Sequence, residues 1–245
     1  MHSNFLFDLD QTLLNFHASE YKALGIVLQE NGLAFSDDIY NSFKVCNKSL
    51  WLELEKQTIT RTELFTKRFN YVIELAGGDI TKFDALKINN DFINTMAVNG
   101  VLMDGALEFV KRLKDEIEGA KLYIITNGAT VNAKGRIEST GLNNFIDGLF
   151  VSEDMGVSKP AAEYFDIVLK KIGAPKESCI VVGDSLSSDM LGAKNAGLSS
   201  VWFMPSGDIE EAIKEYDINF TAQNFDELLD VLKDWGENLK LSKKI

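Results

Sequence analysis

Short, continuous apolar runs recur along the chain, and each is followed by polar residues. The first run is Phe5-Leu6-Phe7, and similar runs cover residues 122–125, 149–151, 180–182 and 201–204. Runs of this length, rich in aromatic and β-branched side chains, are typical of buried strands. Helical stretches follow three of the later runs. This alternation of strands and helices predicts an α/β fold with a Rossmann-like, doubly wound parallel sheet.

The starts of those three helical stretches are expected near Ala129, Pro160 and Leu186. Pro160 suits the first position of a helix, because a backbone N–H at that position has no partner within the helix. A further amphipathic stretch, residues 225–235, predicts a helix near the end of the chain.

Residues 15–100 carry a different pattern, in which apolar side chains recur at helical spacing. We expect four amphipathic helices, whose apolar stripes span residues 21–28, 39–50, 64–75 and 83–96. The first should stop near Gly32, the second should start at Ser36-Asp37-Asp38, Gly77-Gly78 should close the third, and the fourth should end before Gly100. They separate the first strand from the rest of the α/β pattern, so they predict an inserted all-helical cap domain. The expected boundaries are 1–14 and 101–238 for the core domain and 15–100 for the cap domain.

Charge and composition narrow the range of partners. The formal net charge is −12, which argues against a nucleic-acid polymer as partner, because such partners require a basic surface. The two cysteines, Cys46 and Cys179, have no metal-ligand spacing. The N-terminus lacks the basic region of a signal peptide, and no stretch approaches the ~18 apolar residues of a membrane span. We therefore expect a cytoplasmic protein with no membrane partner.

Several kinds of active site are absent from the sequence. There is no Gly-x-Gly and no Gly-Lys-Ser/Thr, so the dinucleotide fingerprint and the P-loop are both missing. The chain has two histidines, His2 and His17, which argues against a histidine-based triad or zinc site. The available chemistry is that of carboxylates, hydroxyls, lysines and backbone amides.

Four polar clusters lie where predicted strands end. Each alone has an ordinary explanation, such as a helix cap, a turn or a solvated lysine. Because ligands of open α/β sheets bind at the carboxyl ends of strands, we expect the four clusters to meet in one crevice. The clusters are Asp8/Asp10/Thr12, Thr126/Asn127, Ser158/Lys159 and Asp184/Ser185 with Asp189.

Carboxylates gathered in this way need a counter-ion. Asp8, Asp10 and Asp184 would repel one another, and like charges ~4 Å apart cost several kcal/mol even at an effective dielectric near 20. Mg²⁺ relieves such repulsion, takes one or two protein carboxylates and binds phosphate oxygens as well. It would also shield an incoming phosphate from an anionic nucleophile. The sequence therefore predicts Mg²⁺ as cofactor.

These clusters resemble the four motifs of the haloacid dehalogenase superfamily of hydrolases with a helical cap. The similarity covers nearly the whole chain. The motifs are Asp8-Leu9-Asp10-Gln11-Thr12, Thr126 within Ile124-Ile125-Thr126-Asn127-Gly128, Lys159 within Ser158-Lys159-Pro160, and Gly183-Asp184-Ser185-Leu186-Ser187-Ser188-Asp189.

The resemblance implies a phosphatase. Asp8 would be the nucleophile that forms an aspartyl-phosphate, and Asp10 the general acid and base. Lys159 would balance charge on Asp8 and the phosphoryl group, and Thr126 with the backbone near Asn127 would hold phosphate oxygens. Mg²⁺ would be held by Asp8, the backbone carbonyl of Asp10, and Asp184. Asp189 would act through a water molecule or by supporting the residues that bind the ion.

Other activities of the superfamily remain open to different degrees. Dehalogenases resemble this chain in fold but lack the acid at the position of Asp10. A phosphonatase would need a cap lysine that forms a Schiff base, and a sugar phosphomutase shares the first motif. A noncatalytic phosphate-binding or interaction protein would be free to lose Asp8, Asp10 or Lys159.

The second and fourth motifs resemble those of the branch that contains pyrimidine 5′-nucleotidases. A small phosphorylated metabolite, such as a nucleoside 5′-monophosphate, is therefore the expected substrate. The expected quaternary state is a monomer or a homodimer.

Overall fold

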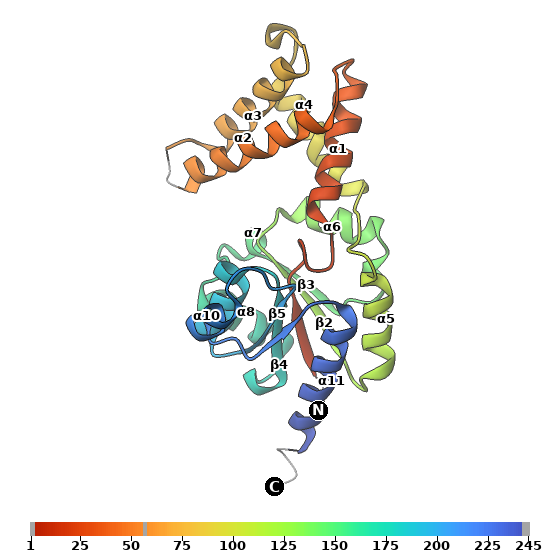
Figure 1. The fold of residues 1–245 in the computed structure, drawn as a ribbon, viewed down its shortest axis with the longest axis vertical. Coiled ribbons are helices and arrows are strands. Elements are labelled where there is room, and N and C mark those ends of the chain that lie inside the picture. Colours follow the sequence, from red (N-terminus) through yellow and green to blue (C-terminus); the bar gives the residue numbers. More distant parts are fainter. Residues whose placement is uncertain (1–2, 56–57, 242–245) are drawn as a thin grey trace. The chain divides into compact units, whose positions relative to one another are not determined.

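The computed structural model describes residues 3–55 and 58–241. The chain divides into two compact units, one made of the residues up to 16 and from 100 onward, the other of residues 17–99. The first unit contains a six-stranded, all-parallel sheet in the order β3-β2-β1-β4-β5-β6 (Figure 1). The predicted α/β fold is confirmed. The strands are β1 (Asn4–Phe7), β2 (Lys121–Thr126), β3 (Gly148–Val151), β4 (Cys179–Gly183), β5 (Ser199–Phe203) and β6 (Phe220–Ala222).

The register of the sheet determines where the loops that carry the predicted site residues begin. Strand β1 pairs with β2 on one side and β4 on the other, and Phe7 is opposite both Ile124 and Val182. From β1 the chain builds β2 and β3 on one side, then crosses to build β4, β5 and β6 on the other. The strand order therefore reverses next to β1, the position at which open α/β sheets bind their ligands.

Helices cover both faces of the sheet because β1 is apolar on both sides. Phe5 and Phe7 pack in the core formed with α5 (Ala106–Glu116), α6 (Thr130–Ser139) and α11 (Phe225–Leu241). Leu6 points the opposite way, into the core formed with α8 (Ala162–Ile172) and α9 (Leu191–Ala196). Side chains that alternate along a strand point to opposite faces, so burial of all four β1 residues requires both layers. The short helix α7 (Ser152–Met155) follows β3, and α10 (Ile209–Tyr216) lies between β5 and β6.

The expected helix start at Pro160 is wrong. Helix α8 begins at Ala162, because the backbone before it is held by distant side chains. Asn127 accepts from the N–H of Lys159 (3.0 Å) and donates to its carbonyl (2.9 Å), and Asn195 donates to the carbonyl of Pro160 (3.0 Å). The stretch expected near Leu186 is a π-helical turn, Leu186–Met190, which Ser185 caps.

Within its described residues, the second unit contains four α-helices, as predicted: α1 (Phe16–Glu30), α2 (Asp37–Glu55), α3 (Arg61–Leu75) and α4 (Ala85–Val98). Phe43, Phe69 and Phe92 pack against one another, with ring centroids 5.5–5.9 Å apart. Helix α3 begins at Arg61, ahead of the apolar stripe that starts at Leu64, and a capping box between Thr60 and Glu63 defines that start.

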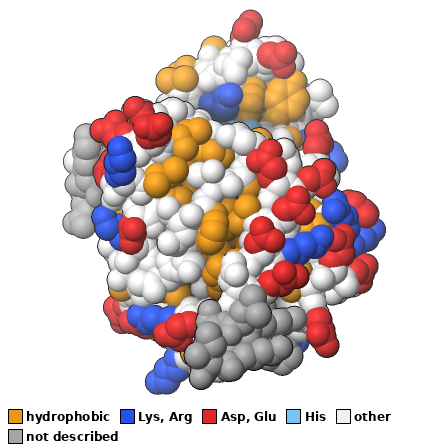
Figure 2. Space-filling model, turned by 60° about the horizontal axis from the view of Figure 1, so that its bottom comes forward, with side chains coloured by type: hydrophobic (Ala, Val, Ile, Leu, Met, Phe, Trp, Pro, Cys, Tyr) orange, Lys and Arg blue, Asp and Glu red, His pale blue; other side chains and the backbone are white. Residues whose placement is uncertain are grey.

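Figure 2 shows one face of the molecule, on which Asp and Glu side chains lie among Lys, Arg and apolar side chains, in keeping with the negative net charge. Within residues 3–55 and 58–241, none of the helices combines the length and the apolar character that a membrane crossing needs.

Candidate active site

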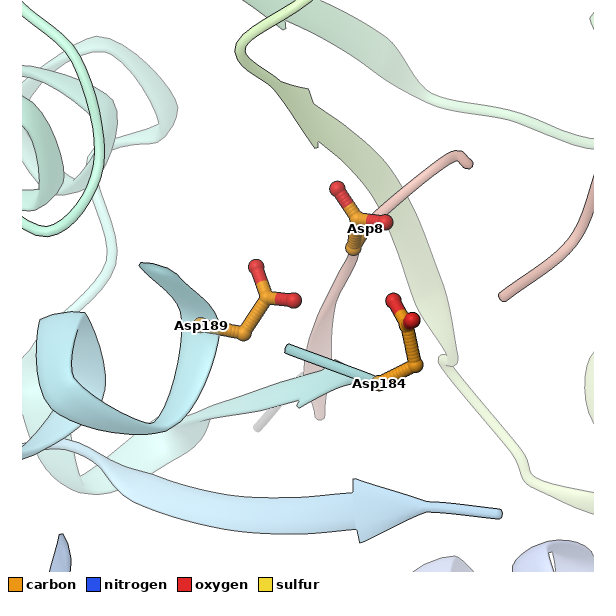
Figure 3. A group of neighbouring side chains, drawn as sticks. All are labelled: Asp8, Asp184 and Asp189. Atoms are coloured by element: carbon orange, nitrogen blue, oxygen red, sulfur yellow. The ribbon is translucent and has the colours of Figure 1, made fainter. Parts of the chain in front are cut away.

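Three aspartates meet at the carboxyl ends of β1 and β4. Asp8 directly follows β1, Asp184 follows β4, and Asp189 lies in the π-helical turn after it. One carboxylate oxygen from each lies within 4.8 Å of the others (Figure 3). The N–H of Asp8 donates to the carbonyl of Val182 (2.8 Å), so the β1–β4 pairing continues to Asp8 itself. The structure thus brings together Asp8 of the first predicted cluster with Asp184 and Asp189 of the fourth, while the carboxylate of Asp10 is not part of this group.

Lys159 connects these carboxylates. Its ammonium group donates to Oδ1 of Asp8 (2.6 Å), Oδ1 of Asp189 (2.7 Å) and the carbonyl of Ile125 (3.0 Å). These three bonds use all three hydrogens of the ammonium. Lys159 is only 3% exposed, so its charge is held away from solvent. One side chain therefore ties together the ends of β1 and β2 and the turn after β4.

The position of Lys159 depends on Asn127, whose side-chain amide bonds to both backbone groups of Lys159. The side chain of Asn127 is thereby committed to the protein, so the predicted contact with a phosphate oxygen would have to come from its backbone N–H. Thr126, also buried, accepts from the N–H of Gly128 through Oγ1 (3.0 Å). In that arrangement its hydroxyl can still donate to a phosphate oxygen.

The electrostatics of the cluster favour a cation. Burial, and then the charge of Asp189, raise the pKa of Asp184 to about 6. Burial also raises the pKa of Asp8, and Lys159 offsets only part of that effect. Burial alone would lower the pKa of Lys159, but Asp189 and Asp8 outweigh it and raise that pKa, so Lys159 stays charged. Three carboxylates around one ammonium leave an excess of two negative charges, which a divalent cation would neutralise.

The residues present fit Mg²⁺. All the ligand atoms are hard oxygens, which this ion prefers. Gly183 makes room for the cluster, because a Cβ at this position would collide with Oδ2 of Asp189. The same oxygen accepts from the N–H of Ser185 (3.2 Å), and Trp202 donates to the carbonyl of Asp184 (2.9 Å). These contacts hold the carboxylates close together despite their repulsion.

Asp10 has a partner that the sequence did not predict. Both oxygens of its carboxylate accept from the guanidinium of Arg136, a side chain that is 1% exposed. A signal was present: in the helix that follows Gly128, Arg136 lies between Ala133 and Ile137, both of which face the core. A charged residue on the apolar face of a helix indicates a buried partner.

Comparison with known proteins agrees with this geometry. Residues 3–197 match the family model described as haloacid dehalogenase-like hydrolase. YfnB of Bacillus subtilis, named as a HAD-hydrolase, is 30% identical over 93% of this chain and 94% of its own length. Pyrimidine 5′-nucleotidase PynA of Streptococcus pneumoniae is 33% identical over 82% and 83%. Pyrimidine 5′-nucleotidase YjjG of Escherichia coli is 32% identical over 80% and 83%.

A solved structure is also similar over almost the whole chain. The crystal structure of Bacillus subtilis YfnB bound to magnesium superposes with a TM-score of 0.80 at 29% identity. The similarity covers 94% of this chain and 98% of that one. That crystal structure is described as revealing interdomain movement in YfnB.

Proposed function

This chain belongs to the haloacid dehalogenase-like hydrolases, and on that basis we propose that it hydrolyses phosphate monoesters through a phosphoryl ester on Asp8. One observation carries the proposal: the buried ammonium of Lys159 holds Oδ1 of Asp8 at 2.6 Å, beside the carboxylates of Asp184 and Asp189. A carboxylate fixed in this way is oriented for attack, and the excess negative charge around it supports a divalent cation.

In the proposed reaction an oxygen of Asp8 attacks phosphorus, and the bond from phosphorus to the ester oxygen breaks. Asp10 gives its proton to the departing oxygen and then takes a proton from the water that hydrolyses the aspartyl-phosphate. Such assistance is typically worth ~10²–10⁴-fold. Lys159 balances the charge on Asp8 and the phosphoryl group, while Thr126 and the backbone N–H of Asn127 hold phosphate oxygens.

The proposed ligands of Mg²⁺ are Asp8, Asp184 and the backbone carbonyl of Asp10. Asp189, whose two oxygens accept from Lys159 and Ser185, would act through water or by supporting the other ligands. The bound ion would neutralise negative charge that otherwise opposes the approach of a phosphate dianion.

The proposed substrate is a pyrimidine nucleoside 5′-monophosphate. Support comes from two relatives named as pyrimidine 5′-nucleotidases, each of which is similar to this chain over at least 80% of its length. The residues around Asp8 contact only the phosphate in this scheme, so the preference for a base has to come from elsewhere in the chain.

The direct test is phosphate release from a panel of phosphorylated metabolites. We expect release that depends on Mg²⁺ and stops on chelation with EDTA, with the highest kcat/KM for UMP, CMP or dTMP. Purine nucleotides and sugar phosphates are the matched comparisons. Turnover that survives EDTA would contradict the proposed need for Mg²⁺. A sugar phosphate preferred over every nucleotide would contradict the proposed nucleotide substrate. Isomerisation that needs a bisphosphate activator, with little phosphate released, would identify a mutase instead.

Metal removal should change stability in a way that depends on pH. The pKa of Asp184 is about 6 in the folded chain and ~3.9 when unfolded. Without metal, the stability linked to this group is therefore fully present below about pH 4 and is lost as the pH rises through 6. Mg²⁺ binds the ionised carboxylates, so its stabilising effect should grow over the same range.

We expect Mg²⁺ at about 100 times its Kd to stabilise the chain by about 2.7 kcal/mol near pH 7.5, or roughly 5–10 °C in Tm. Near pH 5 the shift should be much smaller. Thermal unfolding with Mg²⁺ and with EDTA at both pH values measures the difference, and Asp184→Asn should abolish the Mg²⁺ shift. Equal Mg²⁺-induced shifts in Tm at the two pH values would contradict the assignment of Asp184 as a Mg²⁺ ligand.

A further inference from the structure

Arg136 is a buried cation aimed at the proposed acid and base. It donates through Nη1 to Oδ1 and through Nη2 to Oδ2 of Asp10, the second at 3.2 Å. Its own position is fixed, since its side chain is 1% exposed and its guanidinium carbon lies 5.5 Å from the ring centroid of Phe16. A guanidinium cannot be deprotonated in a protein, and its planar fork matches both oxygens of a carboxylate.

The backbone around Asp10 also limits where its carboxylate can go. Gln11 has a φ of 62°, and the N–H groups of Leu13 and Leu14 both donate to the carbonyl of Leu9. The chain is thus turned back tightly after Asp10, so χ1 and χ2 of Asp10 are its main remaining freedom. A carboxylate on a fixed backbone can occupy several staggered rotamers, and two bonds from a rigid fork select one of them.

The selected orientation faces the second motif. Oδ2 of Asp10 lies 3.8 Å from the position where a Cβ on Gly128 would stand, and Oγ1 of Thr126 lies 3.2 Å from that same point. The carboxylate of Asp10 therefore lies beside the loop proposed to hold phosphate oxygens.

Helix α6, which carries Arg136, also contacts the two residues at which the first unit is interrupted, Phe16 and Gly100. A Cβ on Gly100 would lie 2.8 Å from the carbonyl oxygen of Arg136, and the N–H of Gly100 donates to Oγ of Ser139 (3.1 Å). Phe16 lies against the guanidinium. Within the first unit, the backbone of Arg136 is therefore packed against Gly100 and its guanidinium lies by Phe16.

We propose that Arg136 is a positioning residue that orients the side chain of Asp10 for its proton transfers. When Asp10 is protonated, one of its oxygens keeps its bond to the guanidinium and the other carries the proton that passes to the departing oxygen. The carboxylate left behind accepts both bonds of the fork until it takes a proton from the attacking water. The inference rests on the proposed role of Asp10 as acid and base. Displacement of a reacting group by about 1 Å can cost on the order of 10²-fold in rate, so loss of the fork should slow the step that needs the proton.

The leaving group of the substrate provides the test. The first substrate is the nucleotide with the highest kcat/KM in the metabolite panel. It is an alkyl phosphate, so its departing oxygen needs a proton. The second substrate is p-nitrophenyl phosphate, whose leaving group is stable as an anion. The ratio kcat/KM reports the first phosphoryl transfer. We expect Arg136→Met to lower kcat/KM for the nucleotide by about 10–10²-fold more than for the aryl phosphate. Arg136→Lys, which keeps the charge but not the fork, should lie between Arg136→Met and wild type.

Two reference variants separate the possible failures. Asp10→Asn should show the same discrimination as Arg136→Met; if it shows none, the proposed role of Asp10 fails and the inference falls with it. If Asp10→Asn slows the nucleotide more than the aryl phosphate but Arg136→Met slows both substrates equally, the proposed positioning role of Arg136 is overturned and the role of Asp10 stands. Arg68→Met is the matched structural control, because Arg68 is also buried and donates to Asn89 and Asn47 within residues 17–99. It should lower Tm without changing the substrate ratio.

A structural readout completes the test. In a crystal structure of Arg136→Met, or of Arg136→Lys if the first variant does not fold, the Asp10 carboxylate should leave its wild-type rotamer or occupy several. A carboxylate that stays in its wild-type place in the variant would overturn the inference.

Discussion

Asp8→Asn is expected to lower kcat by at least about 10⁴-fold, on the scale seen when a nucleophile is removed from a covalent catalyst. A neutral amide oxygen does not attack phosphorus to form an ester, and an amide would bring no charge to a bound cation. The amide has nearly the same shape as the carboxylate, and its oxygen can still accept from Lys159, as Oδ1 of Asp8 does at 2.6 Å. The loss should therefore fall on chemistry and not on the fold.

The same substitution should not destabilise the metal-free chain. Burial raises the pKa of Asp8, so the folded state disfavours its charged form, and a neutral amide removes that penalty. In EDTA at pH 7.5 we expect the Tm of Asp8→Asn to equal or exceed that of wild type. Acid-quenched mass spectrometry should detect a phosphoryl adduct on the peptide with Asp8 in wild type and none in the variant. Asp230→Asn, an exposed change on α11, is the control, and turnover of Asp8→Asn within tenfold of wild type would contradict the nucleophile assignment.

The aspartates at the strand ends could be predicted from sequence because their placement follows from local patterns and one rule of topology. The run Phe5–Phe7 identifies a buried strand, so Asp8 must stand at its carboxyl end, and the next runs place Thr126 and Asp184 in the same way. Parallel strands bring these ends to one edge of the sheet without any knowledge of side-chain contacts. Burial and pairing of Lys159 did not follow from that rule, since a lysine before a proline is usually solvated.

Features that depend on distant partners were missed for a physical reason. Asn127 fixes the backbone of Lys159 from 32 residues away, and this contact moves the start of α8 past Pro160. Arg136 pairs with Asp10 across 126 residues, although its burial could have been inferred from the apolar face around it. Strand β6 was missed because it has three residues and begins at the exposed Phe220, so it lacks the apolar run of a buried strand.

Lys159→Met should lower both the stability and the activity of the chain, whereas Asp8→Asn should lower only the activity. Loss of the ammonium leaves Asp8 and Asp189 buried without the cation that bonds to both. Breaking a buried ion pair from one side typically costs ~3–5 kcal/mol, which corresponds to a fall of roughly 6–20 °C in Tm for a chain of this size. Activity should fall by about 10³-fold or more, because charge on Asp8 and the phosphoryl group is no longer balanced.

A double variant separates the two effects of Lys159. Adding Asp189→Asn to Lys159→Met removes one of the unpaired buried charges, so the pair should be more stable than Lys159→Met alone, while turnover stays lost. Lys171→Met, an exposed change in the last turn of α8, should alter stability by no more than about 0.5 kcal/mol. If Lys159→Met kept the wild-type Tm, its ammonium would not be compensating the buried aspartates. If the double variant regained turnover, Lys159 would act only by relieving the repulsion between Asp8 and Asp189, and its proposed contact with the phosphoryl group would be wrong.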